Sequence, residues 1–139
     1  MKKETISIGL VVSEFNAEIT EKMLAAALAC ARREGCAVAK VVRVPGAYDT
    51  PLAAKKLLKM RGIDAVAVIG AIVTGGTKHD EFIASAMANA LTSLSLEFEK
   101  PVTLGVIGPG ATYAKANARA KEYAERAVMG AKKLVTGMK

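Results

Sequence analysis

Residues Ala65–Val73 have the sequence AVAVIGAIV, in which every residue is apolar. A strand with one wet face alternates polar and apolar residues, whereas a strand covered on both faces is apolar throughout. Both-face burial is typical of the middle of a parallel sheet, where helices cover each side. This stretch therefore predicts an α/β protein.

The segments on either side of this strand repeat one pattern. Three further β-branched runs predict strands at residues 6–12, 37–44 and 102–107. Apolar residues three and four apart predict helices at 17–34, 50–61, 77–98 and 112–136. Strands and helices alternate without linkers or repeats, which predicts a flavodoxin-like, three-layer α/β/α fold with a four-stranded parallel sheet. Right-handed crossovers favour the strand order 2-1-3-4, and we expect residues 1–139 to form this one domain.

Composition narrows the classes of partner. The 139 residues are 52% hydrophobic and 24% charged, an ordinary globular balance, and their formal net charge is +7. A positive charge suits a nucleic acid, an acidic lipid or a phosphorylated metabolite. Basic residues are scattered in short doublets, however, and 4% aromatic residues without Trp offer little for base stacking. We therefore expect no nucleic-acid partner.

The cysteines and the apolar runs indicate the compartment. Cys30 and Cys36 match neither a Cys-x-x-Cys redox pair nor a zinc framework, so we expect two reduced structural thiols. The N-terminal residues contain no long apolar run typical of a signal peptide, and no later segment approaches about 20 apolar residues. We expect a cytoplasmic protein with no membrane partner.

The segments that follow the four strands predict where a ligand binds. All four are polar or turn-forming, and they comprise residues 13–16, 45–51, 74–81 and 108–112. Open α/β sheets bind ligands beyond the carboxyl ends of their strands, where the strand order reverses. The expected site therefore lies between the first and third strands.

The third of these segments carries a candidate anion site. Gly75 and Gly76 allow the backbone to approach a ligand, and Thr77 begins a helix whose free N–H groups favour a phosphate. The same three residues also suit an ordinary strand-to-helix turn with a threonine cap.

His79 is the only histidine and lies in the first turn of that helix. A single histidine is more often a surface or packing residue than a catalyst. A helix N-terminus disfavours the imidazolium and would leave a neutral imidazole able to accept a proton. Asp80 and Glu81 favour the charged form, so the residues leave the direction of a pKa shift open.

Two further residues have two interpretations each. Phe15, exposed after the first strand, could stack on a planar ligand or form a hydrophobic staple on the following helix. Asp49 could accept hydrogen bonds from a polyol or cap the next helix.

The chain contains no Walker sequence, no complete dinucleotide fingerprint and too few clustered ligands for a metal site.

Four motifs, in order and over nearly the whole chain, carry a resemblance to a known family. They are Phe15-Asn16, Val44–Pro51, Gly75–Glu81 and Lys100–Val106. Together they resemble the 6,7-dimethyl-8-ribityllumazine synthases of riboflavin biosynthesis, and Gly108–Thr112 is closer to the archaeal members. A paralogous archaeal riboflavin synthase shares the fold but lacks the Gly-Thr-x-His sequence, so His79 favours the lumazine synthases.

The resemblance implies a transferase. It would condense 5-amino-6-(D-ribitylamino)uracil with 3,4-dihydroxy-2-butanone 4-phosphate, releasing phosphate and water, with no metal or redox cofactor. It also implies a homo-oligomer, either a pentamer or a sixty-subunit shell of pentamers. The alternative from another class is a non-catalytic module that binds flavin or a phosphometabolite and has no need of His79.

The resemblance also implies a role for each candidate site residue. His79 would move protons, Phe15 would stack on the pyrimidine, and Arg119 is the best match for the family's phosphate-binding arginine, with Arg126 and Lys115 as alternatives. Other contacts to the two substrates would come from Asn16, Ala47, Tyr48, Asp49, Ile72, Val73, Gly76, Thr77 and Leu104.

Overall fold

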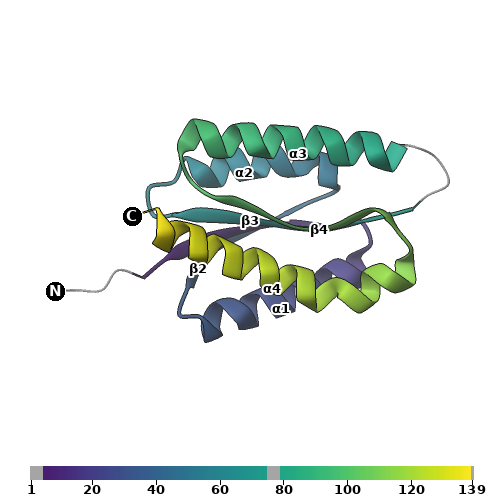
Figure 1. Ribbon diagram of the computed structural model, residues 1–139, viewed down its shortest axis with the longest axis horizontal. Helices are drawn as coiled ribbons and strands as arrows, with labels where there is room; N and C mark the ends of the chain where they lie inside the picture. The colour runs from purple at the N-terminus through teal and green to yellow at the C-terminus, as the bar shows by residue number, and fades with distance from the viewer. Residues whose placement is uncertain (1–4, 75–78, 139) are drawn as a thin grey trace.

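The computed structural model describes residues 5–74 and 79–138, which form one parallel sheet in the predicted order β2-β1-β3-β4. Figure 1 shows the strands alternating with helices along the chain. The elements are β1 (Ser7–Ser13), α1 (Ala17–Arg33), β2 (Ala37–Val44), the 3-10 turn η1 (Ala47–Asp49), α2 (Thr50–Leu58), β3 (Ala65–Val73), α3 (His79–Phe98), β4 (Val102–Ala111) and α4 (Tyr113–Gly137). The predicted α/β architecture is confirmed.

The sheet lies between two helical layers, with α2 and α3 on one face and α1 and α4 on the other (Figure 1). Alternate residues of β3 point to the two layers. Ala67 and Ile69 pack in the core shared with α1 and α4, and Val66 and Val68 pack in the core shared with α2 and α3. The predicted burial of β3 on both faces is therefore confirmed.

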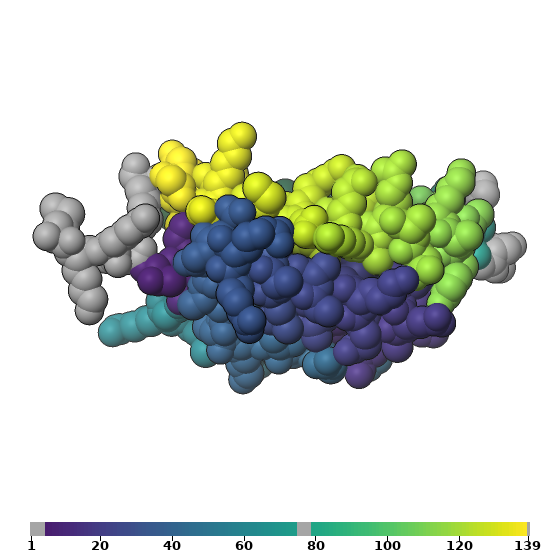
Figure 2. Space-filling view, turned by 90° about the horizontal axis from the view of Figure 1, so that it is seen from below, coloured from purple at the N-terminus to yellow at the C-terminus, as the bar shows by residue number. Residues whose placement is uncertain are grey.

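Helices α1 and α4 lie side by side across one face of the molecule (Figure 2). Small buried residues such as Ala27 of α1 and Ala124 of α4 permit this close packing.

The Tyr113 hydroxyl at the start of α4 donates a hydrogen bond to Glu18 Oε2 at 2.8 Å, which raises the pKa of Tyr113. The phenol is thus neutral at physiological pH.

Cys30 and Cys36 are free and buried at the end of α1 and the start of β2. Burial raises the pKa of both thiols, because an apolar surrounding disfavours the thiolate. The buried positions of both side chains are consistent with the structural role expected from the sequence. Among the described residues no helix is long and apolar enough to cross a membrane.

Helix α2 ends three residues before the predicted boundary at 61. Lys100 Nζ donates hydrogen bonds to the carbonyl oxygens of Leu58 at 2.9 Å and Met60 at 3.2 Å. These contacts satisfy carbonyl groups that a helix end leaves without intrahelical partners. The early end of α2 depends on a lysine 42 positions away from Leu58, which local periodicity does not reveal.

Strand β4 extends beyond the predicted end at 107, so the predicted loop at 108–112 is wrong for Gly108–Ala111. Val73 pairs with Ala111 after a register shift, and the Thr74 N–H donates to the Ala111 carbonyl at 2.8 Å. Gly108 and Gly110 have φ angles of +97° and +91°. Two glycines and a proline resemble a turn in sequence, but here positive φ angles let the strand continue through an irregularity.

Gly105 of β4 lies directly against α4, which makes the sheet–helix contact sensitive to one methyl group. A Cβ at Gly105 would lie 2.9 Å from the Tyr123 carbonyl oxygen and 3.0 Å from Ala127 Cβ. We expect Gly105→Ala to lower the free energy of unfolding by about 1–3 kcal/mol through overpacking, as measured by urea denaturation.

Gly130→Ala is the matched control for this prediction. A Cβ at Gly130 would meet Thr103 Cγ2 at an ordinary 3.5 Å, and alanine favours a helix over glycine by about 1 kcal/mol. We expect this variant to be at least as stable as the parent protein. Equal stability of the two variants would contradict the tight contact at Gly105.

Candidate active site

A cavity of about 280 Å³ lies at the carboxyl edge of β1 and β3, where the strand order reverses. It is the site expected from the loops that leave the strands. Its walls come from the ends of β1 and β3, from the β2–α2 connection and from the first turns of α3. The lining residues are Ser13, Phe15, Gly46, Ala47, Tyr48, Ala71, Ile72, Val73, His79, Asp80 and Ile83.

Backbone hydrogen bonds beyond the strand ends place Phe15 at this cavity. The Glu14 N–H donates to the Val44 carbonyl at 2.8 Å, and the Phe15 N–H donates to the Pro45 carbonyl at 3.0 Å. The loop after β1 therefore stays beside the loop after β2. The Phe15 side chain is 73% exposed, so the interpretation as a hydrophobic staple is wrong and the ring is available to a ligand.

Asn16 connects the β1–α1 loop to β3. Its backbone is left-handed, with φ 64° and ψ 50°, and its side chain makes no cap hydrogen bond to α1. The Asn16 amide instead donates from Nδ2 to the Ala71 carbonyl oxygen at 2.9 Å. This bond holds the loop against the strand end that continues into Ile72 and Val73.

The β2–α2 connection forms a compact turn around Ala47 and Tyr48. Asp49 Oδ2 accepts the Gly46 N–H at 3.0 Å, and Thr50 Oγ1 donates to the Ala47 carbonyl at 2.8 Å. The Asp49 side chain does not cap α2, so that interpretation is wrong. Ala47 is buried, whereas the ring of Tyr48 is exposed at the cavity.

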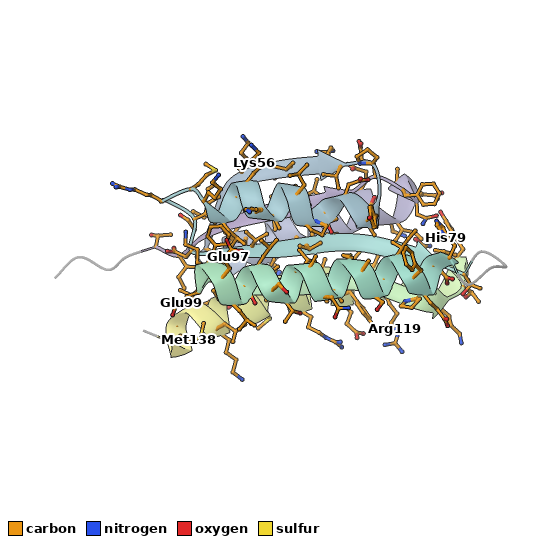
Figure 3. All side chains as sticks on the ribbon, turned by 90° about the horizontal axis from the view of Figure 1, so that it is seen from above. Lys56, His79, Glu97, Glu99, Arg119 and Met138 are labelled. Carbon is orange, nitrogen blue, oxygen red and sulfur yellow. The ribbon has the colours of Figure 1, made fainter. Side chains whose placement is uncertain are left out.

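His79 and Asp80 enter the cavity from the first turn of α3. His79 is exposed, and Figure 3 shows it at the end of the molecule where α3 begins. The structure brings this histidine, Phe15, Ile72 and Val73 to one cavity. Gly76 and Thr77 lie outside the described residues.

Arg119 and Leu104 lie outside this cavity. Arg119 lines a separate surface pocket of about 520 Å³ together with Lys115 and residues 107–111. Leu104 is 44% exposed and lines a third pocket between β4 and α3. Figure 3 shows Arg119 projecting outward from the ribbon, well away from His79. One chain therefore does not bring these predicted site residues together.

Arg119 forms an ion pair with a neighbouring carboxylate of α4. Arg119 Nη1 lies 3.4 Å from Glu122 Oε2, and Arg126 Nη2 lies 2.9 Å from the same oxygen. The Arg126 guanidinium also lies over the Tyr123 ring at 5.0 Å from its centroid. Both arginines thus share the Glu122 carboxylate, and Arg126 has the cation–π contact in addition.

The sequence placed Ser13, Gly46 and Asp80 in the loops around the expected site without giving them a substrate contact, and it did not place Ala71 and Ile83 there, although all five line the cavity. Their positions carry a usable signal, because residues at strand ends and in the first turn of the following helix meet at this edge of a parallel sheet. Ser13 in particular is a polar residue that directly follows the apolar run Ile8–Val12 of β1. Within residues 5–74 and 79–138 no three His, Cys, Asp or Glu side chains form a group that could hold a metal ion.

The fold and the cavity define a doubly wound α/β protein with a small-molecule site at the switch point of its sheet. Comparison with known sequences refines this class. The chain belongs to the 6,7-dimethyl-8-ribityllumazine synthase family, whose sequence model matches residues 5–139.

The chain is similar to several archaeal lumazine synthases. It is 53% identical to the 6,7-dimethyl-8-ribityllumazine synthase of Saccharolobus solfataricus over 135 residues, which cover 97% of this chain and 88% of the relative. The corresponding protein of Metallosphaera sedula is 47% identical over 139 residues, covering 100% and 92%. That of Sulfolobus acidocaldarius is 49% identical over 134 residues, covering 96% and 85%.

The left-handed backbone of Asn16 gives a testable difference between two variants. Asn16→Ala and Asn16→Gly both remove the bond to the Ala71 carbonyl, but only glycine accepts positive φ without a steric cost. We expect Asn16→Ala to be the less stable of the two by about 1–2 kcal/mol in urea denaturation. Equal stability would contradict the left-handed conformation of the loop.

Proposed function

We propose that this chain condenses 5-amino-6-(D-ribitylamino)uracil with 3,4-dihydroxy-2-butanone 4-phosphate to form 6,7-dimethyl-8-ribityllumazine. Membership of the lumazine synthase family supports this reaction. The observation that carries it in the structure is one cavity that Phe15, Ile72, Val73 and His79 all line. These groups suit a planar heterocycle whose reaction requires proton transfer.

The reaction joins two substrates in four steps. The 5-amino group attacks the ketone of the butanone phosphate, and the adduct loses water to form an imine. Proton abstraction then allows the phosphate to leave, and the ribitylamino nitrogen closes the second ring with loss of another water. The protein has to orient two molecules, bind a phosphate and move protons, all of which side chains and main chain can do.

The pyrimidine and its side chain occupy the cavity in this proposal. The exposed ring of Phe15 stacks on the pyrimidine, and main-chain groups of Ile72 and Val73 bind its polar edge. The turn at Ala47–Asp49 binds the ribityl chain. Because Asp49 Oδ2 already accepts the Gly46 N–H, we assign Oδ1 to the ribityl hydroxyls.

The butanone phosphate occupies the side of the cavity next to α3. We assign its phosphate to Gly76 and Thr77, since these residues directly precede α3 and a helix N-terminus favours an anion. We place His79, two residues after Thr77 and three after Gly76, next to the carbon skeleton between the phosphate and the pyrimidine. Its role is to transfer the protons of imine formation and phosphate elimination.

Incubation of the purified protein with both substrates tests the function. We expect product absorbance and fluorescence to develop together with release of inorganic phosphate. A non-catalytic flavin or phosphometabolite module would bind ligand without turnover. Failure under conditions where one of the archaeal relatives is active would overturn the proposal.

His79→Gln tests the proton-transfer role. We expect kcat to fall by about 10²-fold with little change in substrate affinity, because a general acid or base acts on the chemical steps. Stopped-flow rates and equilibrium binding of the ribitylaminouracil measure the two effects separately. Unchanged turnover in a folded variant would remove His79 from the mechanism.

We also propose that the site is completed between subunits of a closed ring, a pentamer or a shell of pentamers. Arg119 and Leu104 support this, because both carry family-implied substrate contacts and both lie outside the cavity of their own chain. A head-to-tail interface that closes by rotation brings such residues of one subunit to the cavity of its neighbour. The ring is cytoplasmic in this proposal, consistent with its two free cysteines.

Mixed assemblies test the shared site. Phe15→Ala and Arg119→Ala proteins, each nearly inactive alone, are co-assembled in equal amounts. Random mixing leaves about a quarter of the interfaces with both residues intact, so we expect about a quarter of the parent activity. Co-assembly of Phe15→Ala with His79→Gln is the control, and it recovers nothing because both residues line the cavity of one chain. No recovery in the first mixture, with co-assembly verified by mass spectrometry, would contradict a shared site.

A further inference from the structure

The floor of the active-site cavity is formed by small residues where the sheet core ends. On the face toward α2 and α3, Val11 of β1 and Val68 of β3 are fully buried and paired across the two strands. Two residues further along each strand, on the same face, come Ser13 and Gly70. The change from two valines to serine and glycine removes side-chain volume and opens space above the core.

Ser13 and Gly70 lie against each other. A Cβ added at Gly70 would be 3.2 Å from Ser13 Cβ and 3.7 Å from Ser13 Oγ. The 3.2 Å contact is tight, so the absence of a side chain at Gly70 is what accommodates the Ser13 side chain. Because Ser13 also lines the cavity, its hydroxyl lies on the cavity floor.

The Ser13 hydroxyl differs from the other buried hydroxyls of the described chain. Thr50 Oγ1 donates to the Ala47 carbonyl at 2.8 Å, and Thr20 Oγ1 donates to the Ala17 carbonyl at 3.5 Å. Ser13 is only 1% exposed, yet within residues 5–74 and 79–138 its Oγ makes no hydrogen bond. Among the described residues no fully buried side-chain oxygen or nitrogen lacks a hydrogen-bond partner, so the Ser13 hydroxyl opens onto the cavity, where a ligand can pair with it.

We propose that Ser13 is a specificity-determining residue whose hydroxyl forms a hydrogen bond with the ribitylaminouracil. The inference rests on the proposed function. The bond is assigned to this substrate because Ser13 lines the same cavity as Phe15 and Ala71–Val73, where the proposed function places the heterocycle. A hydroxyl can donate or accept, so it can pair with a ring carbonyl, an N–H or a ribityl oxygen of this substrate.

Calorimetric titration with 5-amino-6-(D-ribitylamino)uracil tests the assignment on the full-length protein. We expect Ser13→Ala to bind about tenfold more weakly than the parent protein, the effect of one hydrogen bond at a closed site. KM for the butanone phosphate stays within about twofold, and Tm does not fall, since the ligand-free protein loses no internal hydrogen bond. Thr20→Val, which removes a buried hydroxyl outside the cavity lining, leaves the Kd unchanged.

The outcomes separate this inference from the function on which it rests. If the parent protein fails to bind the ribitylaminouracil, the proposed function is wrong and the role of Ser13 falls with it. If the parent protein binds and turns over both substrates while Ser13→Ala has an unchanged Kd, only the assignment of Ser13 is wrong. A loss confined to the butanone phosphate likewise overturns the assignment.

Discussion

The parallel pairing of β1 with β3 is the contact on which the rest of the structure depends. These strands are neighbours in the sheet but are separated in the chain by α1, β2 and α2. The chain leaves them toward opposite faces, into α1 and α3, so the two loops diverge and leave a gap at the carboxyl edge. Burial of β3 by both helical layers holds this pair in the centre of the sheet.

Side-chain size then decides where the core stops and the cavity begins. Val11 and Val68 fill the space between the sheet and the α2–α3 layer, and Ser13 and Gly70 leave it open one step further along. A side chain at Gly70 would crowd Ser13, because its Cβ would lie only 3.2 Å from Ser13 Cβ. The exposed ring of Phe15 and the hydroxyl of Ser13 border the same cavity, and in the proposed function both contact the substrate.

The hydrogen bonds around the cavity hold its loops in place and leave the cavity itself open. The Asn16 amide holds the end of β3, Asp49 closes the turn after β2, and Thr74 joins the exit of β3 to Ala111 of β4. These bonds fix the walls before substrate arrives, which lowers the entropic cost of binding two molecules in register. Arg119 remains on another side of the chain, so the proposed phosphate contact depends on a neighbouring subunit.

The sequence by itself determined the alternation of strands and helices, the strand order and the edge at which the cavity lies. These properties follow from local periodicity and from the handedness of crossovers, which each segment carries within itself. The extension of β4 through Gly108 and Gly110 and the hydrogen bond of the Asn16 side chain were decided only by the tertiary structure. Each depends on a partner far along the chain: Asn16 meets a carbonyl 55 residues away, and β4 continues only because Val73 lies beside Ala111. Hydrogen bonds and contacts of this kind form between residues that no window of sequence contains together, so the identity of Ser13 as part of the cavity floor also required the folded sheet.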